Sequence, residues 1–201
     1  MSRITVWIPL ASLSGQTTAP PLKLLFEEGD RLVTPRPTWE HLQHHGLGSA
    51  AVQAEHLFQQ LHPQPTRACY RTRPYIYLAN PPTNLSNANG AALGILLGLL
   101  AYYHYLPLQQ VMASGTITPS NEPLASPLHP GWPLTSQLQS ARQLGLQSPP
   151  LPFILPYAAE SEKEANQRYQ QQLATLRQLN IQPLFSATLG QALDACQQTT
   201  N

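Results

Sequence analysis

Charged residues are scarce in this chain. Asp, Glu, Lys and Arg make up 10% of its 201 residues, and lysine occurs only at Lys23 and Lys163. An average soluble protein has about 25% charged residues. The formal net charge is +1, and the densest basic group is Arg67, Arg71 and Arg73, so binding of nucleic acid is not indicated. Solubility must depend on neutral polar groups, which suit a surface that contacts other proteins.

Cysteine is nearly absent as well. Cys69 and Cys196 are far apart in the chain, so they form neither a disulfide framework nor a zinc motif. Several histidines lie near one another without a known ligand spacing, which favours solvated side chains over a metal site; they are His41, His44, His45 and His56. We expect no metal, no cofactor and a reducing, cytoplasmic location.

Long apolar runs are also missing. The longest covers residues 91–103, which is well short of the about 20 residues that a membrane-spanning helix needs. The opening segment MSRITVWIPL lacks the charged, apolar and cleavage regions of a secretion signal. We therefore expect no membrane segment and no leader.

The most informative stretch is 84–107, NLSNANGAALGILLGLLAYYHYLP. It reads as a polar loop that leads into a buried helix, with β-like runs at 75–78 before it and 111–117 after it. Gly90, Gly94 and Gly98 recur every four residues, so they share one helix face and indicate close packing against another backbone. Loop amides at a helix start can bind a ligand, although a plain core helix without chemistry is the simpler interpretation.

The rest of the chain predicts alternating short strands and helices in one α+β domain with a mixed sheet. Strands are expected at 4–10, at 23–26 and 31–33 as a hairpin turning at Gly29 and Asp30, and at 70–79, 111–117, 153–155 and 181–185. The strand at 70–79 suits a central position. Helices are expected from about Trp39 or Ser49 to Leu61, and at 91–103, 134–144, 160–179 and 189–196. The proline-rich stretch 118–133 predicts no regular structure.

Four segments in succession resemble the peptidase domain at the carboxyl end of Lon proteases. They are NLSNANGAALGILLGLLAYYHYLPLQQVMASGTI, LTSQLQSARQLGL, LPFILPYAAESEKEA and NIQPLFSATLGQALDAC. The match covers roughly residues 65–197 and leaves 1–64 as a divergent amino-terminal part of the same single domain, 1–201. The resemblance implies the Lon peptidase fold, a ribosomal-protein-type βαβ domain shared with small-molecule kinases.

Carried over position by position, the resemblance places the family's nucleophilic serine at Asn89, within one residue, and its lysine at Thr135. The acidic residue after the family's glycine turn is replaced too, because Thr116 follows Gly115. The resemblance thus implies a degenerate, catalytically inactive serine peptidase. Such a pseudoenzyme would bind a protein partner or assemble with itself into a ring-like homo-oligomer.

Elementary chemistry gives the same expectation. A serine-lysine dyad needs a lysine amine whose pKa is lowered far below about 10.4, so that it can accept the serine proton. Lys23 is expected in the early hairpin and Lys163 in an exposed helix, and neither is expected to reach the loop at 84–90.

An active Lon-like peptidase remains the alternative, with Ser86 as a relocated nucleophile. His129 is its only histidine base within reach and Glu122 a potential acid partner. His104 lies beyond the core helix, some 20 Å from the loop at about 1.5 Å per residue. Without such partners, Ser86 is a turn or helix-cap hydroxyl.

A third hypothesis comes from the phosphate loop of small-molecule kinases. The segment NLSNANGAALG is similar to their glycine-serine-serine-alanine loop, although it carries asparagines where those kinases have glycine and serine. No Walker-type motif occurs, so any ATP-driven unfolding would come from a separate ATPase partner.

Overall fold

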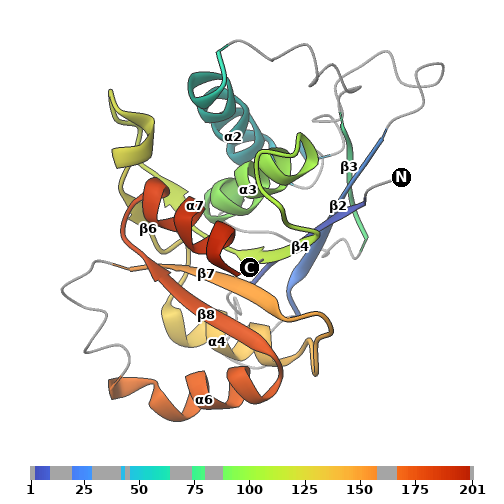
Figure 1. Ribbon diagram of the computed structural model, residues 1–201, viewed down its shortest axis with the longest axis vertical. Coiled ribbons are helices and arrows are strands. Elements are labelled where there is room, and N and C mark those ends of the chain that lie inside the picture. Colours follow the sequence, from blue (N-terminus) through green and yellow to red (C-terminus); the bar gives the residue numbers. More distant parts are fainter. Residues whose placement is uncertain are drawn as a thin grey trace.

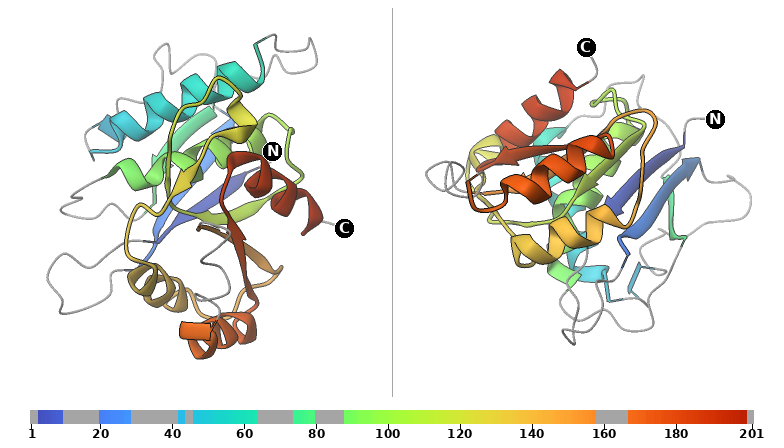
Figure 2. Two further views of the ribbon diagram at one scale, coloured as in Figure 1. Left: turned by 90° about the vertical axis from the view of Figure 1, so that its left-hand side faces the viewer. Right: turned by 90° about the horizontal axis from the view of Figure 1, so that it is seen from below.

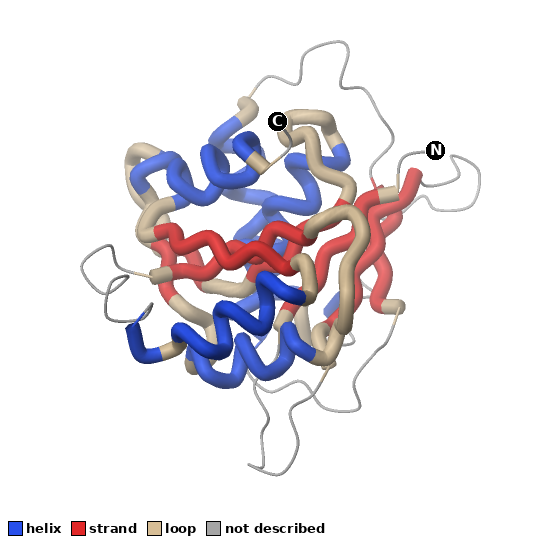
Figure 3. Tube along the Cα trace, turned by 60° about the horizontal axis from the view of Figure 1, so that its bottom comes forward, coloured by secondary structure: helices blue, strands red, loops and turns tan. Residues whose placement is uncertain are grey.

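The computed structural model describes residues 3–9, 20–28, 42–43, 46–63, 74–79, 88–157 and 167–199. Within these ranges the chain forms a sheet with helices on both faces (Figures 1 and 3). The α+β class with a mixed sheet, predicted from the sequence, is confirmed.

The sheet has six strands in the order β3-β2-β1-β4-β7-β8. Their bounds are β1 Ile4–Ile8, β2 Leu22–Glu28, β3 Pro74–Leu78, β4 Gln110–Ala113, β7 Leu151–Pro156 and β8 Ile181–Ser186. Strands β1, β4, β7 and β8 run parallel to one another, whereas β2 is antiparallel to both β1 and β3. A separate two-stranded sheet pairs β5, Thr116–Ile117, with β6, Leu128–His129.

Helices α2 (Gly48–Leu61), α3 (Ala92–Tyr102) and α7 (Leu189–Gln198) contribute to the hydrophobic cluster on one face of the sheet. Helices α4 (Leu134–Arg142) and α6 (Gln170–Gln178) build the cluster on the other face. The described ranges also contain two short 3-10 helices, η2 at Ala88–Ala91 and η3 at Pro123–Ala125. Figure 1 shows α2 and α3 on one side of β7 and β8, with α4 and α6 on the other.

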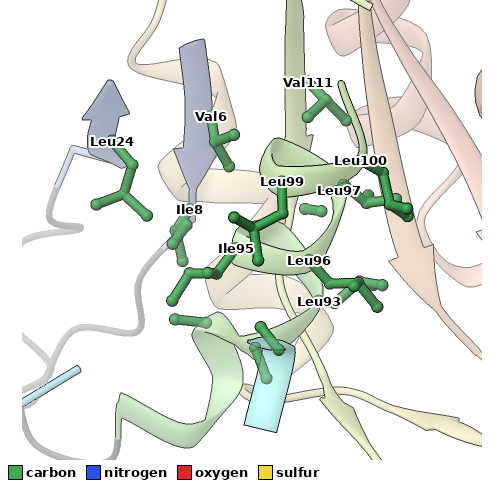
Figure 4. Packing of buried hydrophobic residues seen from close by; sticks show 14 of the residues in the cluster. Val6, Ile8, Leu24, Leu93, Ile95, Leu96, Leu97, Leu99, Leu100 and Val111 are labelled. Carbon is green, nitrogen blue, oxygen red and sulfur yellow. The ribbon is translucent and has the colours of Figure 1, made fainter. Parts of the chain in front are cut away.

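Helix α3 is the centre of the larger cluster, and every one of its residues is buried. It lies against β1, β2 and β4 (Figure 4), where its leucines meet Val6, Ile8 and Val111. The predicted glycine face makes this approach close. A Cβ on Gly94 would lie 2.9 Å from the carbonyl oxygen of Ala113, so only glycine allows the helix to approach β4 at this distance.

Most predicted elements are confirmed, including β1, α3, α4, β7, β8 and α7. The second of the two suggested starts of the first long helix is right, because α2 begins at Gly48. The expected strand at 111–117 is divided at Ser114 and Gly115 between β4 and β5. Helix α6 occupies the second half of the expected span 160–179, and residues 158–166 lie outside the described residues.

Two expectations need correction. Among the described strands, β3 lies at the edge of the sheet and not at its centre, because the strand order begins with β3 and β2 is its neighbour. The strand expected at 31–33 and the turn expected at Gly29 and Asp30 lie outside the described residues. The proline-rich stretch 118–133 does contain regular structure, namely η3 and β6. Prolines at 127 and 130 flank β6 without interrupting it.

His62, which follows α2, gives the end of this helix a pH dependence. Its ring stacks on Tyr105 with centroids 3.5 Å apart, and burial lowers its pKa from the ordinary 6.5. Folded His62 therefore binds protons less readily than unfolded His62. Its contribution to stability is present above pH 6.5 and is lost as the pH falls toward the lowered pKa.

We expect His62 to contribute a decrease in the free energy of unfolding as the pH falls below 6.5. A His62→Phe variant keeps an aromatic ring against Tyr105 and should lose part of this decrease. Urea unfolding of both proteins across this pH range measures the difference. Identical pH profiles would show that protonation of His62 is not coupled to folding.

Candidate functional site

The stretch singled out in the sequence enters the described structure at η2, which contains Asn89 and leads directly into α3. The Gly115 N–H donates to the carbonyl oxygen of Gly90 at 2.6 Å, and the Leu93 N–H donates to the carbonyl oxygen of Gly115 at 3.2 Å. The start of α3 is thus tied to the glycine turn between β4 and β5. Ser86 lies outside the described residues.

A second segment meets η2 through direct backbone contact. A Cβ placed on Gly90 would lie 2.9 Å from the Cα of Gly131 and 2.9 Å from the indole of Trp132. Gly131 belongs to the connection between β6 and α4, four residues before Thr135. The structure therefore brings η2, which carries Asn89, against the connection that leads into α4, which carries Thr135. Asn89 and Thr135 are 46 positions apart in the sequence.

Thr135 lies in the first turn of α4 and is partly buried. Its hydroxyl donates to the hydroxyl of Tyr169, at 3.4 Å, where α6 begins. This position has no amine. The Thr135 side chain connects α4 to α6 and can neither donate nor accept a proton in the way a lysine base would.

A buried neutral hydrogen-bond chain lies beside this contact. The Ser114 hydroxyl donates to Gln137 Oε1 at 2.7 Å, and Gln137 Nε2 donates to the carbonyl oxygen of Trp132 at 2.7 Å. Ser114 and Gln137 are both fully buried. The sequence analysis did not predict these two buried hydrogen bonds. The available signal was that Gln137 falls among the buried positions of α4, next to Leu138 and one turn before Ala141.

Among the candidate bases that the structure describes, Lys23 and His104 lie away from this contact, whereas His129 lies near it. Lys23 lies over the ring of Trp7 at 5.0 Å, on the sheet face that alternates away from α3. His104 follows the far end of α3 with a φ of 63°.

The sequence predicted His129 on an irregular segment, and this is wrong, because β6 holds it opposite Thr116. Its carbonyl oxygen would lie 3.0 Å from a Cβ on Gly115, beside the turn that is bonded to Gly90. His129 is exposed, as is Glu122 at the start of η3.

Cys196 is fully buried in the larger hydrophobic cluster. Burial raises the pKa of its thiol to about 12, so the thiolate that a nucleophile or metal ligand requires does not form near neutral pH. Cys69, His41, His44 and His45 lie outside the described residues. Within the described ranges, no three His, Cys, Asp or Glu side chains gather where they could hold a metal.

A groove opens between α2 and β5, next to the glycine turn. Its volume is about 800 Å³. Gln53 lies at its edge, and its side-chain amide donates to the carbonyl oxygen of Ile117 at 2.5 Å. The residues around this α2–β5 groove are Gln43, Gly48, Ser49, Val52, Gln53, His56 and Thr116. In the left view of Figure 2, α2 runs beside the yellow segment that contains β6.

Comparison with models of known protein families and with curated proteins finds no match to this chain. None of the helices in the described ranges has the length and apolar character needed to cross a bilayer. Inferences about function therefore depend on the residues themselves and on the resemblance in their order.

Proposed function

We propose that this chain is a degenerate Lon-peptidase-like domain that has lost catalysis and acts as a protein-binding or assembly module. One observation carries the proposal. The backbone contact between Gly90 and Gly131 brings η2, where the resemblance expects a serine and the chain has Asn89, against the connection to α4. In the first turn of α4 the resemblance expects a lysine, and the chain has Thr135. The element order from η2 through α7 also supports it.

The surrounding chemistry supports the loss of catalysis. The hydroxyl of Ser114 is already committed to Gln137, a neutral amide that cannot act as a general base. Lys23 lies on the opposite face of the sheet from α3. A hydroxyl nucleophile at this contact would therefore find no lysine amine among the described residues to accept its proton.

Binding to protein is supported by the low charge of the chain, 10% of residues, and by its abundant neutral polar side chains. A separately encoded partner and a ring of identical subunits both fit such a surface. A cytoplasmic location is part of this proposal.

The test is labelling with a biotinylated phosphonate that reacts with activated serines, together with hydrolysis of fluorescent casein. An active serine peptidase serves as the positive control. We expect neither labelling nor turnover, because Thr135 replaces the lysine that would activate a serine.

Labelling of any serine would contradict the proposal. If the label maps to Ser86 and is lost in a Ser86→Ala variant together with turnover, the chain is an active peptidase with a relocated nucleophile. A Ser114→Ala variant is the matched control, since Ser114 is bonded to Gln137 and should not be labelled.

A further inference from the structure

Helix α7 lies at the periphery of the molecule, where it follows β8 (red in the right view of Figure 2). It packs on β8 and on η3. Its fully buried residues are Leu189, Ala192 and Cys196, of which only Leu189 is large, and Leu193 and Ala195 are buried in part. Hydrophobic stabilisation grows with the apolar area that is buried, so α7 is held more weakly than α3, all of whose residues are buried.

Two backbone hydrogen bonds join the start of α7 to the segment between η3 and β6. The N–H of Leu189 donates to the carbonyl oxygen of Ser126 at 3.0 Å. The N–H of Leu128 donates to the carbonyl oxygen of Ala187 at 2.9 Å, two residues before α7 begins. The attachment of α7 therefore depends on this junction as well as on its few buried side chains.

Two buried hydroxyl groups at the same junction are unsatisfied. Ser126 is 0% exposed and Ser186 is 1% exposed, and the Oγ atoms of both have no hydrogen-bond partner among the described residues. Ser126 is the residue whose carbonyl accepts from Leu189, and Ser186 lies three positions before that residue. A hydroxyl that is buried without a partner loses its hydration and gains nothing in exchange, which destabilises the closed junction.

We infer that α7 opens from the sheet as a unit while the rest of the fold stays intact. The small buried area, the short junction and the unsatisfied hydroxyls all occur at one place, and local opening takes place where stabilising contacts are few. Opening hydrates Ser126 and Ser186 and uncovers the face of β8 on which α7 packs. The chain thus has an apolar surface that α7 covers at rest, and this opening is independent of whether the chain cuts peptides.

The thiol of Cys196 reports the opening, because it is fully buried when α7 is closed. A Cys69→Ser substitution in the full chain leaves Cys196 as the only cysteine. Its reaction with dithionitrobenzoate is followed at increasing urea concentrations, and global unfolding of the same protein is followed by circular dichroism. We expect a labelling rate that is nearly independent of urea at low concentration, because opening of one helix exposes little surface, and that rises steeply only near the global transition.

Three further variants connect the opening to the junction. Ser126→Ala removes an unsatisfied hydroxyl and should slow labelling at low urea several-fold. Leu189→Ala removes the largest buried side chain of α7 and should accelerate labelling about tenfold or more. Ser114→Ala is the matched control, since the Ser114 hydroxyl donates to Gln137; it should lower global stability and leave labelling at low urea unchanged.

A labelling rate with the urea dependence of global unfolding at every concentration would overturn the inference. Labelling of Ser126→Ala that is as fast as that of the original chain would do the same, because the hydroxyl would then be satisfied in the closed form. Phosphonate labelling of a serine, by contrast, would contradict the proposed loss of catalysis and leave the opening of α7 unaffected.

Discussion

A Gly131→Ala variant is expected to lose about 3 kcal/mol of unfolding free energy. The added methyl group would be driven into the Cα of Gly90, and it would lie 3.3 Å from the carbonyl carbon of the same residue. Both partners are backbone, so no side-chain rotation can make room. Either η2 or the connection before α4 must move, and each is tied to further elements.

The substitution is also expected to disturb two hydrogen bonds next to the core. Moving η2 disturbs the bond from Gly115 to Gly90, which fixes the glycine turn, and moving the connection disturbs the bond from Gln137 to Trp132. Leaving Gln137 buried and unsatisfied costs about 1 to 3 kcal/mol by itself. The loss is large compared with a total stability of about 5 to 15 kcal/mol.

Urea unfolding followed by circular dichroism measures this loss. Gly48→Ala is the matched control, because the Cβ added there meets Cγ of Gln43, the flexible side chain of an exposed residue, at 2.7 Å. We expect the control to change stability by less than about 1 kcal/mol. Equal effects of the two substitutions would show that the contact between Gly90 and Gly131 yields easily and does not define the site.

The sequence predicted those helices and strands that hydrophobic periodicity and turn residues determine locally. The apolar run that becomes α3, the helical period of α4 and the Gly145 that follows it with a φ of 68° are all visible without knowledge of the fold. The order of strands in the sheet, by contrast, does not follow from local patterns. Aromatic and β-branched residues in β3 suit a strand equally well at the centre or the edge, and only pairing with β2 decides which.

The candidate site, too, could be predicted only in part from the sequence. The resemblance in motif order pointed to Asn89 and Thr135, and the structure brings η2, which carries Asn89, against the connection that precedes Thr135. The α2–β5 groove could not be predicted, because it depends on the contact between Gln53 and Ile117, which are 64 residues apart. Gln137 was missed because one polar residue in an apolar helical face gives no local sign of its partner.

The second large effect is expected where α3 meets β2. A Cβ on Gly98 would lie 2.5 Å from Cε2 of Phe26 and 2.9 Å from Cγ2 of Val6, both on fully buried side chains. Overfilling a packed core costs about 1 to 3 kcal/mol or more. Alanine gains about 1 kcal/mol over glycine in a helix interior, so the net loss in Gly98→Ala is expected near 2 kcal/mol.

The cause can be isolated by changing the ring that blocks the methyl group. Phe26→Leu alone should be destabilising, because it leaves a cavity beside Gly98. Combined with Gly98→Ala, the smaller side chain makes room for the new methyl group, so the double variant should be more stable than the sum of the single effects predicts. We expect a coupling of about 1 to 2 kcal/mol from a double-mutant cycle measured by urea unfolding.

Additive losses would place the cost of Gly98→Ala outside its contact with Phe26, for instance in a shift of the whole helix. Positive coupling would instead show that the spacing between α3 and the sheet is set by this one pair. Since α3 begins at η2, the same spacing positions Gly90 against Gly131. The glycine face that the sequence displays every four residues would then both determine the packing of the core helix and hold the candidate site in place.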